Sequence, residues 1–271
     1  MDKIILAIDI GGTTIKTALV KGTEVLQYKN FATSSSLNEL LEIIKLTSGQ
    51  YRKIHNFDGI GIGLPGLIDF TNQKALFCPN LPYLNGFSPD LLGENVKIAN
   101  DADLALCGEV IINQLKKTTA MFTLGTGIGG ALFFPGAWPF ELPFSGEFGH
   151  LKIAPSGPIC GCGQRGCLEA FIGSKSLLGE AKARISPQID SVKEIFSLAR
   201  DGNPKAAQIV REFSEYLGLG IANVVNITGA EVIILGGQIA KSADVFLSHL
   251  PATVGGKISF AKLRSIEIRS A

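Results

Sequence analysis

The residues best suited to bind a metal ion lie close together, in the stretch GHLKIAPSGPICGCGQRGCLEAF that covers positions 149–171. His150, Cys160, Cys162 and Cys167 offer one imidazole and three thiols, which is a ligand set typical of tetrahedral Zn²⁺. The C-x-C spacing is less usual than the C-x₂-C of zinc ribbons, and a redox role is the alternative. The spacing nevertheless favours zinc, and because four protein ligands leave no open position for water, we expect the zinc to be structural.

A second candidate group is the pair Asn100 and Asp101, which follows the predicted strand that begins with VKIA. A carboxylate beside a carboxamide can deprotonate and orient a hydroxyl group, as phosphoryl transfer to an alcohol requires. The same pair is also typical of a helix N-cap, and for an isolated Asn-Asp pair the cap is the more common explanation. The residues alone therefore leave both interpretations open.

Two glycine-rich turns each follow a short apolar segment. The first, DIGGTT, contains Asp9 and comes after Ile4–Ile8, and the second, GTGIGG, comes after Met121–Leu124. Backbone N–H groups exposed in such turns can bind phosphate, and Asp9 at the end of a buried strand can anchor Mg²⁺ through water. No Gly-Lys-Ser/Thr follows, which excludes a P-loop, and an apolar strand-like segment instead of a helix follows GTGIGG, which disfavours a dinucleotide fold.

These groups must be positioned by strands and helices that alternate along the chain. Apolar residues at helical spacing predict helices over residues 37–46, after a capping serine run, 104–117 and 206–224. GIGIGLPG, residues 59–66, predicts a buried strand that runs into a turn at 64–66, and VKIANDAD, residues 96–103, predicts a strand that ends in polar residues. EVIILGGQIA, residues 231–240, predicts a strand that is broken by Gly236-Gly237. The pattern favours an α/β fold, and the repeated glycine hairpin predicts two α/β domains facing a cleft, residues 1–117 and 118–271.

The composition excludes several classes of protein. A net charge of +1 and a pI near 7.6 give no global attraction for nucleic acid or for an anionic membrane surface. The apolar runs are far shorter than the about 18 residues that span a bilayer, although the mean hydropathy is +0.28. The N-terminal residues do not resemble a secretory signal, so we expect a cytoplasmic protein whose clustered cysteines bind metal. Cys78 and Cys107 lie outside the cluster and are interpreted as buried small hydrophobic residues.

The motifs together resemble those of one protein family. DIGGTTIKTALV and GTGIGG are similar to the two phosphate motifs of sugar kinases in the hexokinase, Hsp70 and actin superfamily. Within that superfamily, GEFGH and CGCGQRGCLE resemble the Glu-x-Gly-His element and the zinc signature of the ROK family, which comprises bacterial sugar kinases and sugar-responsive repressors. The resemblance spans residues 4 to about 240 and implies two actin-like, ribonuclease H-like ATPase domains.

The resemblance also implies a reaction and a set of site residues. It implies ATP-dependent phosphorylation of the 6-hydroxyl of glucose, with Asp101 as the catalytic base and Mg²⁺ as a cofactor. The residues implied to bind the sugar are Asn100, Asp101, Glu147, His150 and Glu169. The residues expected to contact the nucleotide and Mg²⁺ are Asp9, Gly11, Gly12, Thr13, Thr14, Lys16, Gly125, Thr126 and Gly127, with Gly236 and Gly237 near the adenosine.

Several alternatives accompany this hypothesis. N-acetylmannosamine and N-acetylglucosamine kinases of the family share the cysteine loop, and a non-catalytic sugar-sensing regulator is the rival from another class. Family repressors carry a helix-turn-helix segment before the first hairpin, whereas here the first strand is expected to start at Ile4. Asp103 stands where the family commonly has asparagine, which affects the expected Mg²⁺ site. We further expect a homodimer, and we expect the family's last helix to be absent or the sequence to be shortened after Ala271.

Overall fold

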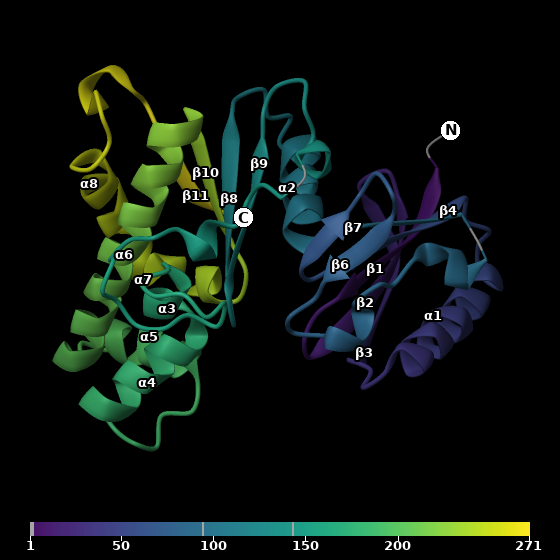
Figure 1. The fold of residues 1–271 in the computed structure, drawn as a ribbon, viewed down its shortest axis with the longest axis horizontal. Coiled ribbons are helices and arrows are strands. Elements are labelled where there is room, and N and C mark those ends of the chain that lie inside the picture. Colours follow the sequence, from purple (N-terminus) through teal and green to yellow (C-terminus); the bar gives the residue numbers. More distant parts are fainter. Residues whose placement is uncertain (1–2, 94, 143) are drawn as a thin grey trace. The chain divides into compact units, whose positions relative to one another are not determined.

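The computed structural model describes residues 3–93, 95–142 and 144–271, and the chain divides into two compact units (Figure 1). The first unit comprises Met1–Gly108 and Pro139–Phe144, and the second comprises Glu109–Trp138 and Ser145–Ala271. The division therefore falls inside a helix, before the boundary at residue 117 that the sequence suggested. The separate roles assigned to residues 1–117 and 118–271 stay predictions.

The first unit carries mainly strands. They are β1 (Ile4–Ile10), β2 (Thr14–Lys21), β3 (Glu24–Ala32), β4 (Gly59–Leu64), β5 (Leu67–Asp69), β6 (Lys74–Phe77) and β7 (Val96–Asn100). Its helices are α1 (Leu37–Arg52), the first part of α2 (Asp101–Ile112), and the short 3-10 helices Pro82–Leu84, Pro89–Leu92 and Pro139–Glu141.

The second unit carries most of the helices. Its strands are β8 (Thr119–Leu124), β9 (Ile128–Phe133), β10 (Val232–Gly236) and β11 (Glu267–Ser270). Its helices after α2 are α3 (Glu169–Ile172), α4 (Ser174–Arg184), α5 (Val192–Arg200), α6 (Pro204–Thr228), α7 (Ala243–Phe246) and α8 (Leu250–Gly255). Short 3-10 helices cover Phe148–His150, Ile239–Ser242, Leu247–His249 and Ala261–Leu263.

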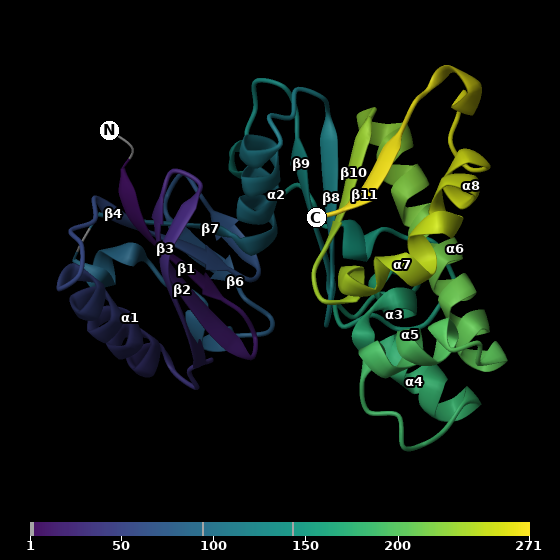
Figure 2. The same ribbon diagram turned by 180° about the vertical axis from the view of Figure 1, so that it is seen from behind.

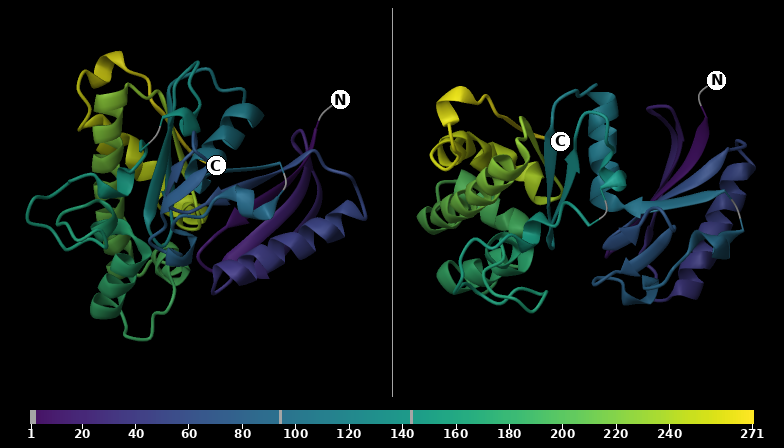
Figure 3. Two further views of the ribbon diagram at one scale, coloured as in Figure 1. Left: turned by 45° about the vertical axis from the view of Figure 1, so that its right-hand side comes forward. Right: turned by 45° about the horizontal axis from the view of Figure 1, so that its top comes forward.

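The sheet of the first unit has the strand order β3-β2-β1-β4-β7. β1 and β2 form the expected antiparallel hairpin, while β4 and β7 run parallel to β1. Helix α1 lies along this sheet and buries Leu40, Ile44 and Tyr51 in its core (Figure 3). Because parallel strands end at the same edge, the residues that follow β1, β4 and β7 gather there.

The sheet of the second unit has the order β11-β10-β8-β9 and repeats the plan of the first. The hairpin β8–β9 is antiparallel, and β10 and β11 run parallel to β8, as β4 and β7 do to β1. Helices α6, α7 and α8 lie on one face of this sheet (Figure 2). The duplication seen in the sequence as one glycine hairpin thus extends to four strands, although the described residues of the second sheet contain no counterpart of β3.

The three expected helices are confirmed, although their ends differ: α1 continues beyond residue 46 to Arg52, and α2 begins earlier, at Asp101. Ser36 caps α1 by accepting a hydrogen bond from the backbone of Glu39, and α6 covers the long apolar pattern. Helix α2, however, stops at Ile112 and does not reach Lys117. Gln114 has φ 50°, a left-handed conformation that cannot continue a helix, and the Asn113 amide turns back to the carbonyl oxygen of Glu109 at 3.1 Å. Across the ranges described, every helix is too short or too polar to cross a membrane.

Candidate functional site

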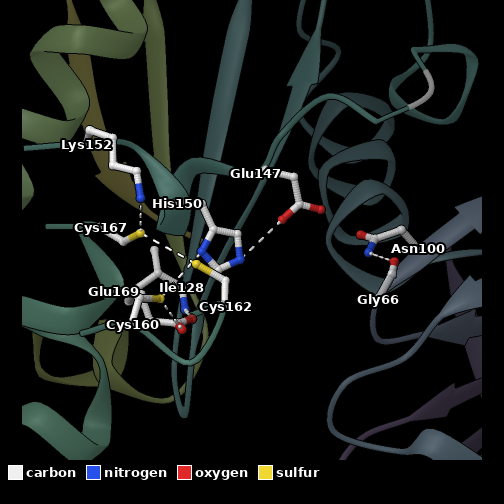
Figure 4. Close-up of polar contacts among 10 residues, drawn as sticks. All are labelled: Gly66, Asn100, Ile128, Glu147, His150, Lys152, Cys160, Cys162, Cys167 and Glu169. Atoms are coloured by element: carbon white, nitrogen blue, oxygen red, sulfur yellow. Dashed lines mark hydrogen bonds and ion pairs between the residues drawn. The ribbon is translucent and has the colours of Figure 1, made fainter. Parts of the chain in front are cut away.

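Asn100 ends β7 and places its side chain at the start of α2. Its Oδ1 accepts hydrogen bonds from the backbone N–H groups of Ala102 at 2.8 Å and Asp103 at 3.1 Å, which is the geometry of an N-cap. Its Nδ2 donates to the carbonyl oxygen of Gly66 at 2.9 Å, in the turn after β4 (Figure 4). The capping interpretation of Asn100 is therefore confirmed, while sugar binding by the second hydrogen on its Nδ2 stays a prediction.

Asp101, the first residue of α2, is partly buried at the carboxyl edge of the sheet. Its Oδ1 accepts a hydrogen bond from the backbone of Ala102 at 2.9 Å. Burial raises the pKa of Asp101 to about 6, the nearby Asp9 carboxylate adds to this, and the Ala102 N–H and the charge of Lys16 oppose it. A carboxylate with a pKa near 6 accepts protons better than an ordinary aspartate and is still ionised at neutral pH. These are the properties of a general base.

Asp9 and Lys16 face each other across the β1–β2 hairpin. Lys16 Nζ lies 2.9 Å from Asp9 Oδ2, and both side chains are about half exposed. The hydrogen bond to Asp9 raises the pKa of Lys16, and the Asp101 carboxylate acts in the same direction. The first glycine turn therefore brings an accessible ion pair within electrostatic reach of the candidate base.

The turn between β1 and β2 is open at its tip. The Gly11 N–H donates to the carbonyl oxygen of Thr14 at 3.0 Å, which closes the turn. Gly12 and Thr13 are exposed, and no atom lies within 4 Å of the position that a Cβ on Gly12 would take. Since packing does not require glycine at position 12, its bare backbone is available to a ligand such as a phosphate.

In the second unit, the four predicted zinc ligands lie together (Figure 4). Their ligand atoms are all within 4.8 Å of one another, with 3.6 Å between His150 Nδ1 and Cys160 Sγ and 3.7 Å between Cys162 Sγ and Cys167 Sγ. A tetrahedron with Zn–S about 2.3 Å and Zn–N about 2.0–2.1 Å has ligand–ligand distances of about 3.5–3.8 Å. The residues therefore fit zinc, and the expected cluster is confirmed as a four-ligand set.

Two charged side chains surround this cluster. His150 directs Nδ1 toward Cys160 and Nε2 toward Glu147, whose Oε2 lies 3.8 Å away (Figure 4). Such a carboxylate fixes the orientation of a ligating histidine. Lys152 Nζ lies 2.9 Å from Cys167 Sγ, where its positive charge would offset the negative charge of thiolates that bind zinc. Lys152 was not predicted from the sequence, because its contact with Cys167 depends on how the zinc loop folds back.

Glu169, the first residue of α3, contacts both the zinc cluster and the second glycine turn. Its Oε2 accepts a hydrogen bond from the backbone N–H of Ile128 at 2.9 Å, and its Oε1 lies 3.6 Å from Cys160 Sγ (Figure 4). Binding of a sugar by Glu147, His150 or Glu169 stays a prediction, since each of these side chains already has a partner within the second unit.

Gly236, the last residue of β10, and Gly237 line a cavity near the second glycine turn. The Gly125 N–H donates to the carbonyl oxygen of Gly127 at 3.0 Å, which closes the β8–β9 turn. Gly237 has φ 89°, and a Cβ there would lie 2.4 Å from the carbonyl oxygen of Leu124, so only glycine fits. A cavity of about 440 Å³ opens beside this contact, lined by Leu235, Gly236, Gly237, Ala240, Lys241, Ala243, Asp244, Ser270 and Ala271.

This chain is similar to known proteins along nearly its whole length. The protein-family sequence model described as ROK family matches residues 5–261 of this chain. The chain belongs to the ROK family. The structure of a ROK family glucokinase from Streptomyces griseus in complex with glucose and AMPPNP superposes with a TM-score of 0.83 at 25% identity, covering 99% of this chain and 94% of that one. The family resemblance and the α/β fold are thereby confirmed.

Curated relatives of similar identity carry different functions. The glucokinase of Halalkalibacterium halodurans is 29% identical over 92% of this chain and 84% of its own length. The N-acetylmannosamine kinase of Vibrio cholerae is 30% identical over 94% and 90% of the two chains. The xylose repressor of Bacillus spizizenii is 29% identical over 93% of this chain and 69% of its own length. Sugar kinases and sugar-linked repressors are thus both close in sequence.

Proposed function

We propose that this ROK family protein is an ATP-dependent sugar kinase in which Asp101 removes a proton from the acceptor hydroxyl. The observation that carries the proposal is a partly buried carboxylate with a raised pKa, about 6, at the carboxyl edge of the first sheet, near the Asp9–Lys16 pair. A regulator that only binds sugar needs no proton acceptor with these properties, whereas phosphoryl transfer to an alcohol does.

The reaction assigns separate tasks to the two oxygens of Asp101. Oδ1 is held by the Ala102 N–H, so Oδ2 is the oxygen that accepts the proton. As the O–H bond breaks, the sugar oxygen forms a bond to the γ-phosphorus of ATP, and the bond from that phosphorus to the β,γ-bridging oxygen breaks to release ADP. Most of the catalysis in such a transfer comes from positioning and charge neutralisation.

The remaining predicted residues divide between nucleotide, metal ions and sugar. Asp9 would hold Mg²⁺ through water, and the bound ion would neutralise charge on the phosphates. Gly11, Gly12, Thr13 and Thr14 and, in the second unit, Gly125, Thr126 and Gly127 would offer backbone and hydroxyl donors to the phosphates, with the adenosine next to Gly236 and Gly237. His150, Cys160, Cys162 and Cys167 would hold a zinc ion that cross-links the loop and takes no part in the chemistry.

Glucose is the proposed acceptor, with Asn100, Glu147, His150 and Glu169 as its ligands beside Asp101. The S. griseus neighbour was solved with glucose and AMPPNP, which supports this choice. N-acetylmannosamine and N-acetylglucosamine remain rival acceptors, because the V. cholerae kinase is as similar to this chain as the glucokinases are. A homodimer and a cytoplasmic location stay predictions. Sedimentation of the purified chain tests whether it forms a homodimer.

Release of ADP, coupled to a spectroscopic readout, tests the proposal on glucose, N-acetylmannosamine, N-acetylglucosamine, mannose and fructose. Asp101→Asn removes the base and should lower kcat by about 10²-fold or more. Asp69→Asn is the matched control, because it removes the same charge from another half-buried aspartate of the first unit, whose partner is Asn72. If no sugar is phosphorylated, the proposed kinase activity is refuted. If Asp101→Asn keeps full activity, only the assignment of Asp101 as the base is refuted.

A sugar-responsive regulator is the second candidate, and the similarity to the xylose repressor favours it. It predicts that calorimetry detects binding of a sugar while the assay detects no ADP with any acceptor. The two candidates thus give opposite results in the same pair of measurements.

A further inference from the structure

The turn between β8 and β9 is held by side chains from the segment that follows the zinc ligands. Ser174, the first residue of α4, donates its hydroxyl to the carbonyl oxygen of Gly125 at 2.6 Å, and its backbone N–H reaches the same oxygen at 3.2 Å. At the other end of the turn, Glu169 Oε2 accepts the N–H of Ile128 at 2.9 Å. Both ends of the turn are therefore fixed by the chain between Cys167 and α4.

Close packing adds to these hydrogen bonds. A Cβ on Gly127 would lie 2.5 Å from Glu169 Oε2, and a Cβ on Gly173 would lie 3.3 Å from the carbonyl oxygen of Thr126. Since the backbone of the turn touches Glu169 and Gly173 so closely, a shift of the segment that carries them must move the turn.

The contact between Ser174 and Gly125 also sets the direction of a backbone N–H group that could donate a hydrogen bond to a phosphate. A peptide unit is planar and trans, so its C=O and N–H groups point in opposite directions. Holding the carbonyl oxygen of Gly125 against Ser174 therefore aims the N–H of Thr126 away from α4, out of the turn. Ser174 thus orients a backbone donor without touching the ligand itself.

The same segment begins at the zinc cluster. Glu169 comes two residues after the ligand Cys167, and its Oε1 lies 3.6 Å from Cys160 Sγ. The five cysteines are free thiols, so no disulfide fixes the loop between His150 and Cys167. Backbone hydrogen bonds such as that from the Leu168 N–H to the Leu151 carbonyl oxygen at 2.9 Å hold the loop, and four-fold coordination would add a cross-link that further fixes the position of Glu169.

We propose that Glu169 and Ser174 are positioning residues that couple the zinc cluster to the β8–β9 turn, so that zinc loading sets the affinity for the nucleotide. This inference rests on the proposed function in one respect, namely that the turn binds the phosphates. The coupling itself concerns only the second unit and can be measured without any nucleotide.

The first arm of the test measures binding of AMPPNP by calorimetry. Ser174→Ala removes one neutral hydrogen bond to the turn and should weaken AMPPNP binding about fivefold, with zinc content and sugar affinity unchanged. Ser176→Ala is the matched control, since the same change two residues along α4 removes no described hydrogen bond to the turn. Removal of zinc with a chelator should weaken binding more than Ser174→Ala does.

The second arm measures amide hydrogen exchange over residues 124–130. Exchange there, and at Ile128 above all, should become faster in the chelated protein and, near Gly125, in Ser174→Ala, while β1 and β4 of the first unit stay unchanged as an internal reference. Unchanged exchange over the turn in both samples would overturn the proposal. If zinc-loaded wild type binds no AMPPNP, the proposed function fails, but the exchange result still decides the coupling.

Discussion

Replacing Asp101 by asparagine should stabilise the first unit at neutral pH even though it removes the proposed base. The folded state raises the pKa of Asp101 from an ordinary value of 3.8 to about 6, chiefly through burial. Folding therefore disfavours the ionised form, and the neutral amide of asparagine escapes that penalty. A residue kept for catalysis at the expense of stability behaves in this way.

The size of the gain follows from the shift in pKa. One pKa unit corresponds to about 1.4 kcal/mol, so a shift of about two units amounts to about 3 kcal/mol at pH 7.5. Asp101 is only partly buried, and its charge also interacts favourably with the N-terminus of α2, which asparagine gives up. We therefore expect Asp101→Asn to raise the free energy of unfolding by about 2 kcal/mol. The asparagine Oδ1 can still accept the hydrogen bond from Ala102.

The gain should depend on pH in a defined direction. Between pH 4 and pH 6 the folded protein binds more protons at Asp101 than the unfolded chain does, so stability falls as the pH rises through this window. At pH 5.0 the advantage of Asp101→Asn should therefore be about half of its value at pH 7.5.

Urea dependence of hydrogen exchange at the amides of β1, β4 and β7 measures this effect, because these strands report on the first unit alone. Asp69→Asn is the control, because hydrogen bonds from Asn72 lower the pKa of Asp69, which is the opposite shift to that of Asp101. Removing the charge of Asp69 should therefore not raise the free energy of unfolding. An Asp101→Asn protein that is less stable than wild type at pH 7.5, or whose gain is the same at pH 5.0, would refute the assigned burial penalty.

Three further predictions concern turnover, metal and phosphate. The kcat/KM for the sugar should fall about tenfold per pH unit below pH 6, because Asp101 must be ionised, and a flat profile down to pH 5 would contradict its role as base. Mass spectrometry should find about one zinc per chain, none in Cys160→Ala, and an unchanged content in Cys78→Ala, which alters a buried cysteine outside the cluster. Gly12→Ala should leave stability unchanged but weaken AMPPNP binding about 10- to 100-fold, whereas Gly49→Ala, equally unobstructed but on α1, should leave binding unaltered. If Gly12→Ala and Gly49→Ala change AMPPNP binding equally, the first turn does not bind the phosphates as proposed.

The elements of this fold could be predicted because their signals are local. Glycine-rich turns after apolar runs predicted the hairpins β1–β2 and β8–β9, and apolar residues at helical spacing predicted α1 and α6. The zinc cluster was equally accessible, since its four ligands lie within one short loop. The end of α2 was missed because it depends on the left-handed Gln114, whose residue type carries no such signal.

Contacts between distant segments could not be predicted in the same way. The bond from Asn100 to Gly66 requires β4 and β7 to be neighbours, and the bond from Ile128 to Glu169 joins residues 41 positions apart. Nothing in the type or spacing of these residues specifies that pairing, because it follows from strand order and from how the zinc loop folds back. Lys152 and Ser174 belong to the same class.

The two interpretations of Asn100 and Asp101, helix cap and catalytic pair, prove compatible once the contacts are known. Asn100 uses Oδ1 to cap α2 and Nδ2 to join the end of β7 to the turn after β4. These bonds fix the first residue of the helix, and that residue is Asp101, whose Oδ1 is held by Ala102. The cap therefore sets the direction in which Asp101 Oδ2 is presented. A rule that weighs a cap against a catalytic role treats the two as exclusive, whereas in this arrangement the cap is the means by which the proposed base is positioned.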